Sequence, residues 1–158
     1  MRVVLVIALV VVALDQLTKV VALARLPSGV SLDVIDGLVS LTLVLNPGLA
    51  FGLLGGLPVA WRWLVAVLSL GALLVLARVA LRVLAEGTWA DLGAVGLIFG
   101  GAVGNLIDRA RFGAVVDFVD LHLRGYHWPA FNVADSAISV GVVLLALRLL
   151  ARPATSRR

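Results

Sequence analysis

The amino-acid sequence predicts an all-α integral membrane protein with four transmembrane helices, a small β-hairpin or sheet outside the membrane, and an interfacial lid loop. The 158-residue chain is 62% hydrophobic, well above the share of a typical soluble domain. Its apolar residues form four stretches, each near the roughly 20 residues that cross a bilayer as a helix. Because no internal repeat is visible, we interpret residues 1–158 as a single membrane domain.

Composition excludes several kinds of chemistry. The chain has no cysteine, which rules out disulfides, thiolate nucleophiles and cysteine metal sites. The net charge of +4 comes from basic residues that mostly stand at the ends of apolar stretches. Such residues anchor spans at lipid headgroups, so we expect membrane lipid, and no nucleic acid, as a partner.

The predicted spans cover residues 3–24, 61–84, 92–108 and 133–151. An even number of spans places both termini on one side. Lysine and arginine divide almost evenly between the two sides, but the short turn at 85–91 and the basic tail at 152–158 favour a cytoplasmic location for the termini. An alternative is that residues 1–24 are a cleavable signal peptide ending at Ala22-Leu23-Ala24, which Asp15 and Lys19 inside the apolar stretch disfavour.

Two outer loops, 25–60 and 109–132, differ in character. In the first, Asp36-Gly37 stands between two strand-like runs, which is a strong signal for a β-hairpin on the outer membrane surface. The second mixes charged, histidine and apolar residues. That mixture predicts an interfacial lid or amphipathic segment.

Polar residues of three spans meet in one layer. The first and third spans run outward and the fourth runs inward, so the late residues of the first two and the early residues of the last reach the outer surface together. A carboxylate in a span costs roughly 2.5–3.5 kcal/mol at mid-bilayer, and two acids brought together suit an aspartic-type hydrolase. The residues of this layer are Asp15, Asn105, Asp108, Arg109, Asn132 and Asp135, with Asp117 close after the third span.

The same residues can also be interpreted as having a purely structural role. Asp15 and Lys19 have the i,i+4 spacing of a helix ion pair, and Asn132 with Asp135 has the spacing of a helix N-cap. Asp117 can be an ordinary loop acid. Glycines at every fourth position, Gly96, Gly100 and Gly104, predict close helix packing rather than a phosphate loop.

Other chemistries have weaker signals. His122 and His127 could join Asp117 and Asp120 around a metal ion, but the chain has no H-E-x-x-H or comparable ligand spacing. Ser136 lacks a nucleophile-elbow context. We therefore predict neither a metal nor a cofactor.

Four blocks of the sequence carry a further signal: Leu14–Lys19, Asn46–Gly52, Gly100–Arg109 continuing through Val115–Phe118, and Trp128–Ser136. In this order along the chain they resemble lipoprotein signal peptidase (signal peptidase II), the intramembrane aspartic peptidase family of bacteria. Pro47 and Leu49 depart from residues common in the family, a small hydroxyl residue and alanine respectively, which affects only the local turn.

The resemblance implies an endopeptidase that cuts diacylglyceryl-modified prolipoproteins just before the lipidated cysteine, using Asp117 and Asp135 as the catalytic pair. It also implies a monomer in the bacterial cytoplasmic membrane, with both termini inside and the active site near the outer leaflet. Seven further residues would shape the site or contact substrate: Asp15, Lys19, Asn46, Gly48, Asn105, Arg109 and Asn132.

Two other functions also fit intramembrane acids. A proton-coupled transporter or channel needs carboxylates along a path, whereas here they gather at one surface. In a non-enzymatic assembly factor, the polar residues would serve only helix packing, so Asp→Asn changes would cost stability rather than turnover.

Overall fold

The structure is a computed structural model that describes residues 1–48, 63–65, 67–72, 74–75, 78 and 87–151. The described residues between 63 and 78 are helical, while the rest of the predicted span at 61–84 and the basic tail at 152–158 lie outside the described residues. In chain order the elements are α1 (Arg2–Arg25), β1 (Leu32–Ile35), β2 (Val39–Asn46), α3 (Trp89–Phe112), β3 (Val115–Leu123), β4 (Tyr126–His127) and α4 (Val133–Ala151).

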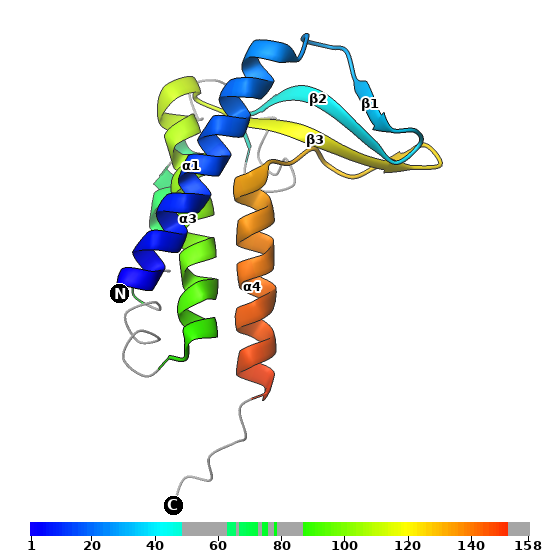
Figure 1. Ribbon diagram of the computed structural model, residues 1–158. Coiled ribbons are helices and arrows are strands. Elements are labelled where there is room, and N and C mark those ends of the chain that lie inside the picture. Colours follow the sequence, from blue (N-terminus) through cyan, green and yellow to red (C-terminus); the bar gives the residue numbers. More distant parts are fainter. Residues whose placement is uncertain (49–62, 66, 73, 76–77, 79–86, 152–158) are drawn as a thin grey trace, which may run out of the picture.

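Three long helices, α1, α3 and α4, run alongside one another, and the sheet extends across one end of this bundle (Figure 1). The start of α1 and the end of α4 lie at the opposite end. The last turns of α1 and α3, the first turn of α4 and the sheet therefore meet at a single end of the molecule.

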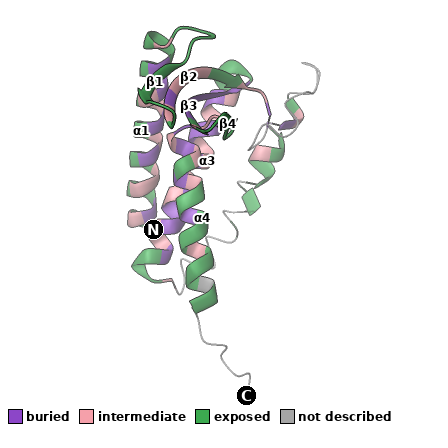
Figure 2. Ribbon diagram, turned by 90° about the vertical axis from the view of Figure 1, so that its right-hand side faces the viewer, coloured by how far each residue is buried: buried purple, intermediate pink, exposed green. Residues whose placement is uncertain are grey.

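Helix α1 has an inside-out distribution of polarity. Its outward face carries large apolar side chains, such as Leu9 and Leu17, which are 68% and 62% exposed, while its buried stripe includes Asp15 and Lys19 (Figure 2). Lipid demands this pattern, because polar side chains in a membrane must find partners inside the protein. Among the described residues, α1 and α3 are the two helices long and apolar enough to cross a membrane.

Small residues let the helices approach closely. A Cβ added at Gly100 would lie 2.8 Å from the backbone oxygen of Ala8 on α1, and one at Gly141 would lie 2.8 Å from that of Ala94 on α3. Both distances are too short for real contacts, so α3 packs against its two neighbours through backbone. The predicted small-residue face of α3 is confirmed.

The sheet has four antiparallel strands in the order β1-β2-β3-β4. The predicted hairpin is confirmed: Leu38 N–H donates to Ile35 O at 3.0 Å, and Gly37 takes a positive φ of 69° at the turn. Strand β2 pairs with β3, although the helical residues between 63 and 78 and helix α3 lie between the two strands in the chain. This pairing sets Asn46 opposite Val115.

The segment 109–132 differs from the predicted lid loop. Helix α3 continues to Phe112 and ends at Gly113, which caps it in the left-handed conformation with a φ of 67°. Most of the rest forms β3 and β4, because the apolar, β-branched run after Gly113 finds a partner in β2. The third helix also starts earlier than predicted, at Trp89, where a capping box between Thr88 and Asp91 begins it.

Candidate active site

Asp117 is a buried carboxylate on β3, 2% exposed. Asn132 Nδ2 donates to its Oδ1 at 2.7 Å, and Asn46 Nδ2 donates to its Oδ2 at 3.1 Å. Asn132 reaches it because the preceding residue, Phe131, pairs with Val119 of β3, the Phe131 N–H donating to Val119 O at 3.0 Å. Both carboxylate oxygens of Asp117 therefore accept hydrogen bonds from neutral amides.

Asp135 stands in the first turn of α4 and is tied to the same asparagine. Its N–H donates to Asn132 Oδ1 at 2.9 Å, and its Oδ2 accepts from the Asn132 N–H at 3.4 Å. Its other oxygen accepts from Asn105 Nδ2 at 2.8 Å. The N-cap arrangement predicted for Asn132 and Asp135 is confirmed, and Asn132 also contacts Asp117.

The two acids influence each other electrostatically. Burial, followed by the negative charge of Asp135, raises the pKa of the Asp117 carboxyl to about 7, against the lowering effects of the hydrogen bonds from Asn46 and Asn132 and of the charge of Lys19. Near neutral pH, Asp117 is thus held close to half protonation. A carboxyl poised in this way can give or take a proton.

A separate charged cluster lies directly behind this pair. Lys19 Nζ contacts Asp15 Oδ2 at 2.8 Å and Asp108 Oδ2 at 2.7 Å, and all three side chains are at most 2% exposed. Gln16 adds hydrogen bonds to both acids, at 3.2 Å to Asp15 and 2.9 Å to Asp108. The i,i+4 pair expected on α1 is therefore present, joined by an acid of α3.

Asn105 connects the charged cluster to the carboxylate pair. Its Oδ1 accepts from Lys19 Nζ at 3.0 Å and from Asn132 Nδ2 at 3.2 Å, while its Nδ2 donates to Asp135. An ammonium group can only donate. Lys19 therefore fixes which way the Asn105 amide points, and so supplies Asp135 with a donor.

Arg109 ties the segment after β2 to α3. Its Nη2 donates to Gly48 O at 2.7 Å and its Nη1 to Asn105 O at 3.3 Å, while the Gly48 N–H donates to Asn46 Oδ1 at 2.9 Å. Arg109 Nε is buried and has no hydrogen-bond partner within the described part of the chain. All nine site residues expected from the sequence thus belong to one connected group.

Sequence reasoning missed what the charged cluster holds in place. Asp108 Oδ2 accepts from the Val116 N–H at 3.0 Å, and Asp15 Oδ1 accepts from the Ala134 N–H at 2.9 Å. Asp108 thus holds the backbone next to Asp117, and Asp15 holds the backbone next to Asp135. One signal was available in the sequence: a single lysine near two acids cannot satisfy all four carboxylate oxygens, so the remaining oxygens need other hydrogen-bond donors.

The chain matches the sequence profile of signal peptidase (SPase) II over residues 7–151. It belongs to the signal peptidase II family. Among its relatives, the lipoprotein signal peptidase of Oleidesulfovibrio alaskensis is 46% identical over 146 residues, covering 92% of each chain. That of Paraburkholderia phytofirmans is 44% identical over 151 residues, covering 96% of this chain and 86% of the relative.

Solved structures agree with this assignment. Two structures described as a bacterial membrane enzyme, at 2.3 and 1.9 Å resolution, superpose with a TM-score of 0.78 each. The first is 32% identical and covers 100% of this chain and 93% of its own; the second is 31% identical, with 97% and 96% covered. As a member of the signal peptidase II family with apolar helices, the protein is a membrane protease.

Proposed function

We propose that this protein is an intramembrane aspartic endopeptidase that removes the signal peptide from diacylglyceryl-modified prolipoproteins, cutting just before the lipidated cysteine. The observation that carries the proposal is the environment of Asp117 and Asp135. Both carboxylates accept hydrogen bonds from neutral amides and share the partner Asn132. Neither forms a salt bridge with any residue that the structure describes.

Two acids in such a site hold a proton between them. The ionised member activates a water molecule for attack on the scissile carbonyl. The protonated member polarises that carbonyl and later delivers its proton to the leaving amine. Because the titrations belong to the pair, the base role is not assigned to either aspartate alone.

Arg109 serves substrate binding and not proton transfer, since a guanidinium does not give up its proton near neutral pH. Its hydrogen bond to Gly48 O holds the segment after β2 close to Asp117, and the buried Nε supplies a donor for a substrate carbonyl. Asn46 and Gly48 shape the same edge of the site. Asp15 and Lys19 act indirectly: Lys19 orients Asn105, and Asp15 holds the backbone at the start of α4.

The location of the site supports a lipid-anchored substrate. The carboxylate pair lies at the end of the bundle that carries the sheet. With both termini in the cytoplasm, that end is the outer surface of the bacterial cytoplasmic membrane. A prolipoprotein anchored by diacylglycerol in the outer leaflet then presents its cleavage site at the depth of Asp117 and Asp135, and a monomer is sufficient.

The test is cleavage of a purified diacylglyceryl-modified prolipoprotein by detergent-solubilised protein, read as a gel shift. We expect Asp117→Asn and Asp135→Asn each to lower turnover by roughly 10⁴-fold, in the range lost when a proton-transferring group of an acid–base pair is removed. Both variants should still unfold cooperatively in thermal scans. The matched control is Asp36→Asn in the exposed hairpin turn, which should cleave at the wild-type rate.

Retained cleavage by either variant would remove that residue from the catalytic pair. If folded wild-type protein does not cleave and the Asp→Asn variants lose only stability, the polar layer serves assembly rather than hydrolysis.

A further inference from the structure

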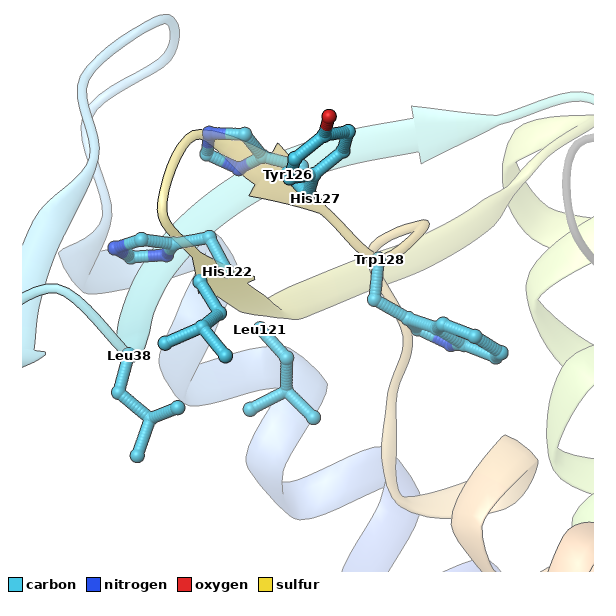
Figure 3. A pocket seen from close by; sticks show the side chains of 7 residues that line it. Leu38, Leu121, His122, Tyr126, His127 and Trp128 are labelled. Atoms are coloured by element: carbon cyan, nitrogen blue, oxygen red, sulfur yellow. The ribbon is translucent and has the colours of Figure 1, made fainter.

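Asp120, His122 and His127 form a second group of side chains suited to a ligand, at the far end of β3 and on β4. One ligand atom from each lies within 4.8 Å of the others. His122 and His127 are cross-strand partners, and Asp120 stands two residues before His122, on the same face of the strand. Figure 3 shows both imidazole rings near each other at the hairpin, with the Trp128 indole extending away from them.

This group is distinct from the carboxylate pair. Side chains alternate along a strand, so Asp117 belongs to the opposite face from Asp120 and His122. His122 lies five positions after Asp117, which is about 16 Å along the strand. Leu38, Leu121 and Tyr126 join the imidazoles around an open, mainly apolar hollow, so the group has an environment of its own.

The contacts within the group leave coordinating capacity unused. His127 Nδ1 lies 2.9 Å from Asp120 Oδ2, so these two atoms already stand near the separation of two ligand atoms on one metal ion. His122 Nδ1 is buried and has no hydrogen-bond partner among the described residues, whereas buried polar atoms are normally paired. The two rings stack with centroids 5.0 Å apart and an angle of 24° between planes, which keeps the two imidazoles next to each other.

We propose that Asp120, His122 and His127 bind a divalent first-row transition metal ion such as zinc. Two imidazoles and one carboxylate suit Zn²⁺, Ni²⁺ or Co²⁺, whereas Mg²⁺ and Ca²⁺ prefer oxygen ligands alone. Ligand atoms about 2.1 Å from one tetrahedral zinc are about 3.4 Å apart. Side-chain rotations that move the ligand atoms by roughly an ångström would therefore bring them to this separation. The open fourth position would hold water.

Such an ion would fasten the β3–β4 hairpin. The two strands meet in a tight turn at Arg124 and Gly125, whose φ angles of 51° and 83° are both positive. β4 has only two residues and pairs with β3 at two positions. A metal bridging His122 and His127 would therefore cross-link a short edge strand that few backbone hydrogen bonds hold.

The test is zinc binding to the full chain purified without a histidine tag, measured by isothermal titration calorimetry in detergent. The chain contains two histidines and no cysteine, so histidine-dependent binding reports this group alone. We expect one Zn²⁺ per chain, and a loss of affinity of at least roughly tenfold in His122→Gln, His127→Gln and Asp120→Asn. Tyr126→Phe, in the same hairpin, is the matched control and should bind as wild type does.

Cobalt provides an independent measurement on the unmodified protein. Wild-type protein loaded with Co²⁺ should show visible absorption bands of a site with nitrogen ligands, and zinc should abolish them by displacement. Absence of these bands together with absence of zinc binding would overturn the proposal. Unchanged zinc affinity in the double variant His122→Gln/His127→Gln would do the same, because the ion would then sit elsewhere.

Discussion

The site contains two neighbouring pairs of aspartates, and their carboxylates have different kinds of partner. Asp15 and Asp108 share the ammonium group of Lys19, at 2.8 and 2.7 Å. Asp117 and Asp135 have no salt-bridge partner among the described residues and depend on asparagine amides instead. Asn105 contacts both groups, accepting from Lys19 and donating to Asp135.

Aspartate thus serves structure in one pair and proton chemistry in the other. Lys19 gives the carboxylates of Asp15 and Asp108 an opposite charge, and both carboxylates also accept hydrogen bonds from backbone N–H groups. A buried carboxyl without a cation retains its proton more readily. The charged cluster positions the site, and the amide-bound pair is left free to exchange a proton.

The largest stability effect should come from removing the shared cation. Lys19→Met leaves Asp15 and Asp108 buried without an opposite charge, which should cost about 3–5 kcal/mol of unfolding free energy. Unfolding in mixed micelles measures it. Arg25→Met on the same helix is the control: Arg25 is exposed, so the change should stay within about 0.5 kcal/mol. Equal effects of the two substitutions would contradict a special role for Lys19.

The amide-bound pair should make stability depend on pH. Asp117 binds its proton more tightly when folded, with a pKa of about 7 against an ordinary 3.8. Its stabilising contribution is therefore complete below about pH 4 and is lost as the pH rises through about 7. Between about pH 5 and 8 the loss should be on the order of 2–3 kcal/mol. Asp117→Asn should flatten this part of the profile; an unchanged slope would show that another group titrates.

A smaller effect should follow from crowding the charged cluster. A Cβ at Gly104 would lie 2.5 Å from Asp15 Oδ2, whereas for one at Gly93, on the same helix, the nearest atom among the described residues would be Ile7 Cδ1 at 3.9 Å. Gly104→Ala should therefore destabilise by about 1–3 kcal/mol, while Gly93→Ala should be neutral or slightly stabilising. Thermal unfolding of the two variants compares them; similar midpoints would mean that Asp15 relaxes freely.

The sequence predicted most of this site because topology alone brings the polar residues together. Spans that run outward and inward in alternation bring Asp15, Asn105 and Asp135 to one level whatever the details of packing. The Asp36-Gly37 hairpin was equally predictable, because a positive φ at the turn requires such a residue pair. These inferences depend on local chemistry and chain direction only.

The division of labour among the acids was not predictable, because it depends on which partners meet in three dimensions. Asp108 and Asp117 look alike in sequence, yet one meets Lys19 and the other meets Asn46 and Asn132. For a similar reason the sequence did not predict strand β3 within the segment 109–132. Its pairing partner, β2, lies some 70 residues earlier in the chain, and local sequence patterns do not predict which distant segments pair.

An infrared titration of the carboxyl groups in wild-type protein and in Asp117→Asn tests directly where the exchangeable proton lies. We expect a carboxylic-acid C=O band that disappears with a midpoint of about pH 7 in the wild type, and no band with that midpoint in Asp117→Asn. A wild type with no carboxyl titrating between about pH 5 and 9, or a band that persists with an unchanged midpoint in Asp117→Asn, would contradict the assignment to Asp117 of the proton that titrates near pH 7.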